Sequence, residues 1–540
     1  MTEKGRLYFG GEIHTVDDVA PFVEAVAVKN GRIIAVGSES ECKSMLGDTY
    51  ESIDLKGKAL LPGFIDTHLH PPLMLFYELS ADLRDITTIE QLQTKMRAVA
   101  QKDKSANWVV GIEFEEKELS EPKIPTRHDL DAACPDRPAF ILMRDGHSLV
   151  ANTKAIQIVG LTASTCDPEG GLIVREDDGY PAGHFCETAS QLILEGMPFP
   201  DMETISNTIE IIGNQISANG ITSAGVILQT DEEGVAGKQG IYDVPLMEMF
   251  IDKIQTNMYV LLVAHDLSPF TNAYKTKLHT PEKMGENRVG GLKFWADGTF
   301  GSWTAYLSSP YTDQPEKSGL LIHDEDEMYR RMVLAHNAGL QIAIHVIGDA
   351  ACRVCVDLFE RLLTKYPKAN HRHRLEHVSL LSEDLIADIS RLNLVVCVNP
   401  SFIHEEKSWL PVRLGLERVK WVYPFRALID AGIKVAAASD APASSLSALD
   451  AIQRCVTREG FEPHQGISAP EAIRMYTIDA AYAQFEESVK GSISVGKRAD
   501  FVILSKNPAT VPTEEIKKIV VEQTISGGEE IYSRNTMKYP

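Results

Sequence analysis

One stretch organises this chain: Leu60-Leu61-Pro62-Gly63-Phe64-Ile65-Asp66-Thr67-His68-Leu69-His70. It is an apolar run that ends in a histidine, one spacer residue and a second histidine. Side chains two positions apart on a β-strand point to the same face, so His68 and His70 aim at one point while Leu69 turns away. Two neutral imidazoles at this spacing are good ligands for zinc and similar divalent ions. The alternative is a pair of surface histidines at a strand end, and further ligands elsewhere in the chain would decide against it.

Length and composition describe a globular protein of more than one domain. The chain has 540 residues, of which 44% are hydrophobic and 24% charged, and this length predicts two or three domains. No apolar run approaches a membrane span, and the charged amino terminus lacks the pattern of a signal peptide. The 53 basic and 76 acidic residues give a net charge of −23, which argues against nucleic acid and anionic membranes as partners.

The eight cysteines show no disulfide-like spacing. Cys352 and Cys355 form a C-x-x-C motif, but they lie in a segment with a helical pattern, where positions three apart share a face. Core packing is therefore favoured over a redox or metal role. This cysteine usage predicts a cytoplasmic location.

Both ends of the chain read as short strands. Residues 6–16 resemble one hairpin-like unit, and residues 24–37 form a second with Asn30-Gly31 as its turn. Residues 491–504 and 518–533 have the same strand-rich character at the other end.

Between these ends, strand and helix patterns alternate. Eight short apolar segments are candidate strands, and helical patterns separate most of them, which predicts a (β/α)₈ barrel of the TIM type within an α/β protein. The candidates are Leu60–His70, Gly220–Leu228, Met258–Ala264, Gly290–Ala296, Leu340–Val346, Arg372–Val378, Leu394–Asn399 and Ile433–Ser439. The interval between the first two is too long for one βα unit, so residues 73–200 are expected to form an inserted α+β domain near the barrel mouth.

Residues suited to metal binding occur at the strand ends of this predicted barrel. Active sites of such barrels lie at the carboxyl ends of the strands. A histidine at one strand end is usually structural, but six residues of ligand type at consistent positions are hard to explain by accident. They are His68, His70, Lys293, His345, His377 and Asp440. Glu376 faces away from His377 on its strand, so we expect it to reach a neighbouring strand rather than a substrate.

These motifs resemble the amidohydrolase superfamily over nearly the whole chain. The Pro-Gly-Phe-Ile-Asp that precedes the two histidines, the order of the ligand residues and the pattern Gly-x-Ile-x-x-Gly-x-x-Ala-Asp at 491–500 all match. The inserted segment is similar to that of the branch with N-substituted formamide deformylases and YtcJ-like proteins. The resemblance implies that the termini pair as a small β-sandwich. The expected domains are then 1–59 with 490–540, the barrel 60–72 with 201–489, and the insertion 73–200.

The resemblance also implies a binuclear metal centre, with two zinc ions as the expected cofactor. In that arrangement His68, His70 and Asp440 hold the more buried ion, and His345 and His377 hold the outer one. Lys293 bridges the two ions as a carbamate, which requires a neutral amine. The alternative for Lys293 is a positive charge paired with Asp297. Relatives differ at the bridge, and some keep a single metal.

The implied chemistry is hydrolysis of an amide-type C–N bond in a small molecule, such as an amide, formamide, cyclic amide or carbamate. Hydroxide formed at the metals would attack the carbonyl, and Asp440 would take the proton and pass it to the leaving nitrogen. A metal-dependent deaminase is the alternative within enzymes, although Lys293 at the bridge argues against it. A catalytically inactive, scaffold-like relative is the alternative outside enzymes. A homodimer is also expected from the resemblance.

Residues for substrate binding are predicted less directly. Arg144 and His147 lie in a motif of the inserted segment, and His147 could donate a hydrogen bond to the substrate carbonyl as charge develops. Asp297 could orient the site or the bridge, and Trp303 could line the pocket. Each of these could equally be a loop or packing residue.

Overall fold

The computed structural model describes residues 5–102, 108–144, 148–168, 170–230 and 237–535. The chain divides into two compact units, Met1–Pro72 with Gly213–Pro540 and Leu73–Ile212. The finer division into three domains with the boundaries given above stays a prediction. Within the described residues, no helix is both long and apolar enough to cross a bilayer.

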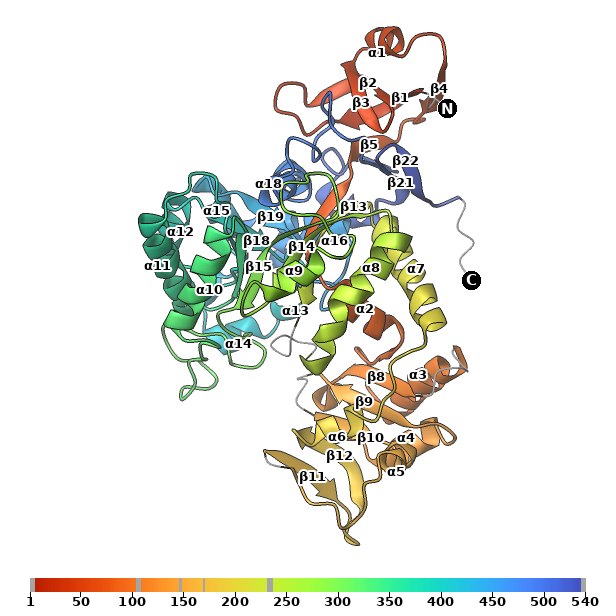
Figure 1. Cartoon of the computed structure of the whole chain (residues 1–540), viewed down its shortest axis with the longest axis vertical. Helices are drawn as coiled ribbons and strands as arrows, with labels where there is room; N and C mark the ends of the chain where they lie inside the picture. The colour runs from red at the N-terminus through yellow and green to blue at the C-terminus, as the bar shows by residue number, and fades with distance from the viewer. Residues whose placement is uncertain (1–4, 103–107, 145–147, 169, 231–236, 536–540) are drawn as a thin grey trace. The chain divides into compact units, whose positions relative to one another are not determined.

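The first and last strands of the chain share one eight-stranded sheet. Its order is β22-β21-β20-β5-β1-β2-β3, with β4 paired to β1, and the red and blue strands meet in Figure 1. This confirms that the termini combine. The strands are β1 Gly5–His14, β2 Phe22–Lys29, β3 Arg32–Gly37, β4 Tyr50–Asp54, β5 Ala59–Pro62, β20 Phe501–Leu504, β21 Val521–Ser526 and β22 Glu529–Ser533, and helix α1 is Glu39–Leu46.

Two details of the terminal segments were predicted wrongly. Residues 6–16 are not a hairpin, because residues 6–14 belong to the single strand β1, whose pairing with β2 shifts register between Phe9 and Ile13. A Cβ at Gly11 would lie 2.2 Å from the carbonyl oxygen of Lys58, so this glycine permits a close backbone approach rather than a turn. Residues 491–504 contain only the strand β20. The Asn30-Gly31 turn between β2 and β3 is confirmed, with φ of 51° and 68°.

The barrel consists of eight parallel strands in the order β6-β13-β14-β15-β16-β17-β18-β19. This confirms the predicted fold. Every residue of its strands is buried except Trp295, the last residue of one of them, as expected for strands covered on both faces. The strands are β6 Phe64–Leu69, β13 Ile221–Gln229, β14 Asn257–Val263, β15 Arg288–Trp295, β16 Gln341–Val346, β17 Arg374–His377, β18 Val395–Val398 and β19 Val435–Ala437.

The predicted first strand is in fact two strands in two different sheets. β5 belongs to the terminal sheet and β6 to the barrel, and the chain passes between them at Gly63. A Cβ at Gly63 would lie 2.3 Å from the Thr222 hydroxyl oxygen, so glycine allows the two backbones to cross closely.

The barrel closes where its last strand meets its first. The Thr67 hydroxyl donates to the Ala437 carbonyl at 3.0 Å, and the Asp440 amide donates to the His68 carbonyl at 2.8 Å. Both contacts lie beside the predicted metal ligands, so the strand contact that closes the barrel also brings Asp440 next to His68.

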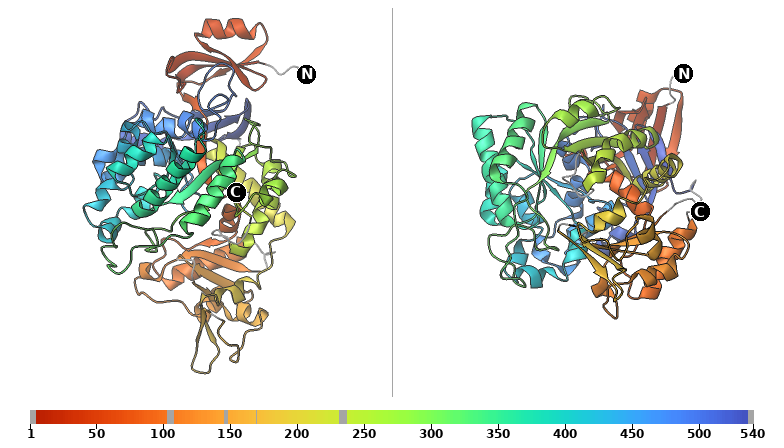
Figure 2. Two further views of the ribbon diagram at one scale, coloured as in Figure 1. Left: turned by 60° about the vertical axis from the view of Figure 1, so that its left-hand side comes forward. Right: turned by 60° about the horizontal axis from the view of Figure 1, so that its bottom comes forward.

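Helices surround the barrel strands, and α10 to α12 lie on their outer side, green to teal in Figures 1 and 2. Cys352 and Cys355 are buried on the inner face of α11, as predicted for core residues. The helices of this part are α7 Met202–Ala218, α8 Asp243–Lys253, α9 Ser268–Ala273, α10 Glu325–Asn337, α11 Asp349–Lys365, α12 Glu383–Arg391, α13 Phe402–Glu406, α14 Leu410–Leu414, α15 Phe425–Asp430, α16 Ala448–Thr457, α17 Ala469–Met475 and α18 Ile478–Ala483.

The unit Leu73–Ile212 is an α+β fold around a six-stranded mixed sheet in the order β11-β12-β10-β9-β8-β7. Apolar clusters line both faces of this sheet. Its strands are β7 Ala81–Asp82, β8 Val109–Phe114, β9 Ala139–Met143, β10 Ser148–Ala151, β11 Gly171–Arg175 and β12 Pro181–Glu187, and its helices include α2 Pro71–Glu78, α3 Ile89–Lys102, α4 Arg127–Ala133, α5 Thr153–Ile158 and α6 Ser190–Leu194.

Candidate metal centre

Three of the predicted ligands converge at the carboxyl end of β6. The Nε2 atom of His70 lies 3.1 Å from Oδ1 of Asp440, and the Nε2 atom of His68 lies 3.5 Å from the same oxygen. One donor atom from each residue falls within 4.8 Å of the others, so His68, His70 and Asp440 form a group that can hold a metal ion. His68 is buried, whereas His70 and Asp440 are slightly exposed.

Local backbone geometry brings Asp440 to the histidines. Asp66, buried below them, accepts hydrogen bonds from the Ser439 amide at 3.1 Å and the His68 amide at 3.1 Å. Asp440 then adopts a left-handed conformation with φ of 61°. Such a conformation is uncommon for a residue with a side chain and is found where the surrounding structure enforces it.

Two further histidines complete the arrangement. The rings of His345 and His377, at the ends of β16 and β17, have centroids 4.6 Å apart, and the His377 ring lies 5.0 Å from that of His68. His345 Nε2 donates to the Gly298 carbonyl at 3.1 Å, and His377 Nδ1 donates to Asn399 Oδ1 at 2.8 Å. In the neutral rings, the lone pair is therefore on Nδ1 of His345 and on Nε2 of His377.

Burial keeps these imidazoles neutral, which is the form that binds metals. It lowers the pKa of His68 to about 3 and lowers the pKa of both His345 and His377. The carboxylate of Asp440 stays ionised: although burial opposes this, the hydrogen bond from His70 holds its pKa below the usual range.

Lys293, on β15, is buried and its Nζ atom has no hydrogen-bond partner in the described part of the chain. Burial lowers its pKa to about 8. The alternative partner, Asp297, instead accepts the backbone N–H groups of Ile347, Gly348 and Tyr306 at 2.8–2.9 Å. The alternative considered for Lys293, an ion pair with Asp297, is therefore not formed in the structure.

These observations fit a divalent cation. Neutral imidazoles and one ionised carboxylate are the donor types of zinc sites. The buried amine of Lys293, which makes no hydrogen bond within the described residues, could join them only after conversion to a carbamate. His68, His345 and His377 are buried, and the attraction of a donor atom to a cation is stronger where water is excluded.

The residues that support the predicted ligands were not predicted from the sequence. Glu376 does not reach a neighbouring strand; it crosses the barrel interior, and its Oε2 lies 2.6 Å from His68 Nδ1. Asn399 orients His377, and the Phe402 ring stacks near His377 with centroids 6.0 Å apart. The one available signal was the alternation of Arg374 and Glu376 on a strand buried on both faces, because buried charges need partners.

The residues predicted to bind substrate have mixed outcomes. His147 lies outside the described residues. Arg144 pairs with Glu118 at 2.5 Å inside its own unit. The indole N–H of Trp303 donates to Asp313 at 3.2 Å, and the Arg413 guanidinium lies 3.8 Å from the centre of its ring. The structure therefore gives Arg144 and Trp303 structural contacts, and their contact with a substrate stays a prediction.

Comparison with known proteins identifies the class to which this fold and site belong. Residues 51–532 match the model of the amidohydrolase family, so the chain belongs to that family. This confirms the resemblance drawn from the first barrel strand and the ligand order.

Individual relatives extend over nearly the full chain. YtcJ of Bacillus subtilis (strain 168) is 29% identical, covering 98% of this chain and 99% of that protein. N-substituted formamide deformylase of Arthrobacter pascens is 27% identical, covering 99% of both. Among solved structures, an uncharacterized metal-dependent hydrolase from Pyrococcus furiosus is 26% identical, covers 94% of this chain and 100% of its own, and superposes with a TM-score of 0.74.

Proposed function

We propose that this protein is a metal-dependent hydrolase that cleaves an amide-type C–N bond of a small molecule. One observation carries the proposal: His68, His70 and Asp440 form a group that can hold a metal ion, and the His377 ring lies next to the rings of both His68 and His345. Buried Lys293 is close enough to act electrostatically on all three of these rings. A relative of nearly equal length is named for the removal of a formyl group from a substituted nitrogen, which supports the bond type.

We propose two zinc ions as the resident cofactor. His68, His70 and Asp440 would hold one, and His345 and His377 the other. When bound, such ions lower the pKa of water and polarise a carbonyl group. The atoms available to bind the second ion are Nδ1 of His345 and Nε2 of His377, because these nitrogens carry the lone pairs.

Lys293 would join the two ions as a carbamate. Its Nζ makes no hydrogen bond to any residue that the structure describes, and burial favours the neutral amine that carbon dioxide requires. A protonated lysine would add a third positive charge beside two cations, which by Coulomb's law costs several kcal/mol even at a moderate effective dielectric constant.

Asp440 would transfer the proton. Its carboxylate lies at the solvent-facing end of the barrel beside His70, and it is ionised at neutral pH, so it can accept a proton from attacking water. The same oxygen can return that proton to the leaving nitrogen, which departs as an amine. His147, from the inserted unit, would donate a hydrogen bond to the carbonyl oxygen as negative charge develops.

The deaminase alternative is disfavoured by Glu376. A deaminase with a single metal needs a glutamate free to exchange protons, but Glu376 is buried and held by both Arg374 and His68. The scaffold alternative is disfavoured because all six predicted ligand positions are filled.

Two measurements test the proposal. Protein purified without chelators is analysed for metal, and it is then assayed against formamides, N-acyl amines, cyclic amides and carbamates. We expect close to two zinc ions per chain and turnover of at least one class that a chelator abolishes and added zinc restores. Protein without bound metal, or turnover that a chelator does not affect, would overturn the proposal.

A further inference from the structure

A buried ion pair lies in the barrel interior, directly behind His68. Arg374 and Glu376 alternate on β17, so both side chains point to the same side, and both have 0% exposure. The guanidinium contacts Glu376 twice, through Nε to Oε1 and through Nη2 to Oε2, the latter at 2.9 Å. This two-point contact fixes the plane of the carboxylate.

The other side of that carboxylate meets the metal ligand. Oε2 of Glu376 lies 2.6 Å from Nδ1 of His68. A carboxylate held by a guanidinium can only accept a hydrogen bond, so the ring proton of His68 is on Nδ1. The lone pair is then on Nε2, the atom that faces Asp440 at 3.5 Å.

Arg374 also holds the backbone beside the ligand. Its Nη2 atom donates to the carbonyl oxygen of Thr67 at 2.7 Å. The pair therefore constrains both the ring of His68 and the peptide that precedes it, although β17 and β6 are not neighbours in the barrel.

We propose that Arg374 and Glu376 are positioning residues that fix the tautomer and the orientation of His68 for a divalent cation. A carboxylate behind a ligating imidazole also makes the imidazole a stronger donor. This inference rests on the proposed metal-dependent function, and neither residue touches the substrate in it. The competing explanation is that the pair only stabilises the barrel.

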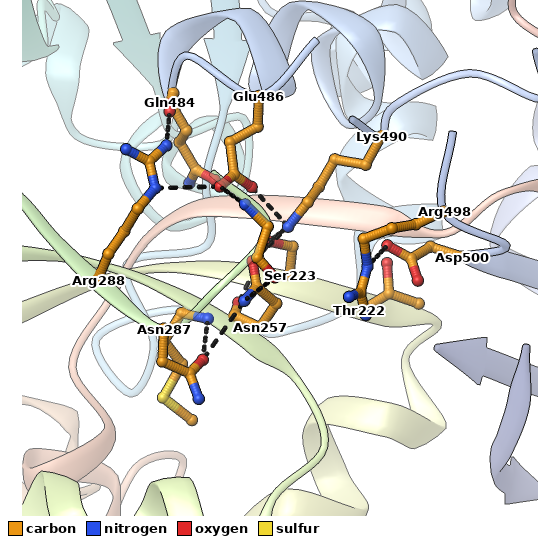
Figure 3. A network of polar contacts seen from close by, with 12 residues as sticks. Thr222, Ser223, Asn257, Asn287, Arg288, Gln484, Glu486, Lys490, Arg498 and Asp500 are labelled. Atoms are coloured by element: carbon orange, nitrogen blue, oxygen red, sulfur yellow. Dashed lines mark hydrogen bonds and ion pairs between the residues drawn. The ribbon is translucent and has the colours of Figure 1, made fainter. Parts of the chain in front are cut away.

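The chain contains a matched control at the opposite ends of the strands. Arg288, at the start of β15, donates through Nε to Oε1 of Glu486 at 3.1 Å, and both are 1% exposed. Lys490 and Asn257 complete this network, which Figure 3 shows in close view. It is a buried arginine–glutamate pair of the same chemistry, but it contacts none of the predicted metal ligands.

The experiment compares Glu376→Gln with Glu486→Gln in the full-length protein. For each variant, zinc affinity is measured by competition with a chromophoric chelator, and the visible spectrum is recorded after loading with cobalt. We expect Glu376→Gln to weaken metal binding about 10- to 100-fold and to change the cobalt spectrum. Glu486→Gln should bind metal as the native chain does, even if its melting temperature is lower.

A second variant covers the case in which Glu376→Gln does not fold. Glu376→Asp keeps the negative charge next to Arg374 but withdraws the carboxylate from His68. Positioning predicts weakened zinc binding in a folded protein, whereas a purely stabilising pair predicts native affinity.

The outcomes separate the two levels of inference. If both Glu376 variants bind zinc with native affinity, the positioning role is overturned. It is also overturned if Glu486→Gln loses as much zinc affinity as Glu376→Gln. In both cases the metal-dependent function stands. A native chain that binds neither zinc nor cobalt overturns the proposed function itself, and the positioning role with it.

Discussion

The Nε2 atom of His70 lies 3.1 Å from Oδ1 of Asp440, although 370 positions separate the two residues in the chain. The contact exists because β19 returns to the side of β6 and closes the barrel, with Asp66 bridging the seam beneath it. A site built on this seam depends on the complete barrel, and its ligands lie at a strand end rather than in the core.

The first prediction concerns the ligands. His68→Ala or His345→Ala should lower metal content and abolish hydrolysis while the chain stays folded, because each change removes a donor from the strand end. Metal analysis, activity and circular dichroism check this. His404→Ala is the control, because His404 is exposed and pairs with Glu459 at 2.8 Å. This variant should contain as much metal as the native protein. Unchanged turnover in both ligand variants would refute the assignment.

A second prediction separates a carbamate at Lys293 from an unmodified lysine. Lys293→Ala should bind metal poorly and lose more than about a hundredfold in activity, beyond the range expected for a supporting contact. A short carboxylic acid such as acetate or propionate should restore part of both, because its two oxygens can replace the bridge. Lys490→Ala, which removes another buried lysine, should not respond to the acid. Two metals beside an unmodified Lys293 in a crystal structure would contradict the carbamate.

The third prediction tests His147. If this residue stabilises the developing oxyanion, His147→Ala should lower kcat/KM about a hundredfold, the usual effect of losing one such donor. Metal content should not change. His128→Ala is a matched control in the same unit, because His128 is exposed and contacts Glu176 at 3.1 Å. If kcat/KM of the His147 variant matches that of the control, His147 is a loop residue without a role in catalysis.

The fourth prediction gives Asp297 a positioning role. Its carboxylate accepts three backbone N–H groups, and burial raises its pKa to about 7. Asp297→Asn turns an amide N–H toward backbone donors, so the free energy of unfolding should fall by about 1–3 kcal/mol. Zinc affinity should fall as well, since His345 bonds to the adjacent Gly298. Asp349→Asn is the control, because Asp349 accepts the Ser308 amide in an exposed position, and this variant should change neither the free energy of unfolding nor the zinc affinity appreciably. Equal effects in the two variants would argue against a positioning role for Asp297.

The last prediction concerns stability against pH. Burial lowers the pKa of His336, His371 and His373, which form a hydrogen-bonded cluster at the amino ends of β16 and β17. The Nδ1 atom of His373 accepts the Ile342 amide at 3.0 Å, so protonation there would break a hydrogen bond. The folded state therefore binds fewer protons than the unfolded state below pH 6.5. Their contribution to stability is present above that pH and is lost as the pH falls.

Denaturant unfolding at pH 7.5, 6.5 and 5.5 in the presence of a chelator measures this effect. Each fully neutral histidine should contribute about 1.4 kcal/mol per pH unit below its unfolded pKa. His373→Gln should flatten the slope by about that amount, although the variant is less stable at every pH. Lys368 acts on the same cluster and lowers these pKa values further, so Lys368→Ala should reduce the slope slightly. If the free energy of unfolding of His373→Gln changes with pH as steeply as that of the native chain, the histidine cluster does not cause the loss of stability at low pH.

Local pattern was enough to predict much of this protein. The strands of the barrel follow from short apolar runs, and the possible metal group of His68, His70 and Asp440 follows from residue type at strand ends, because both patterns are visible along a few residues. The turn at Asn30-Gly31 was predicted for the same reason, since only these residue types readily adopt positive φ at both positions. The resemblance to a known family supplied the expected division of the predicted ligands between two ions.

The tertiary structure decided what depends on contacts between distant parts of the chain. No local signal shows that Gly63 passes the chain from one sheet to another, because the reason is the approach of Thr222. That Asp297 faces three backbone amides rather than Lys293 could not be predicted either, because those amides come from residues 9 to 51 positions away. For Glu376, the two-residue alternation of a strand could predict only that its side chain lies on the face opposite to that of His377. Its contact with His68 exists because the barrel curves β17 and β6 toward a common interior, where a buried carboxylate must find its partners.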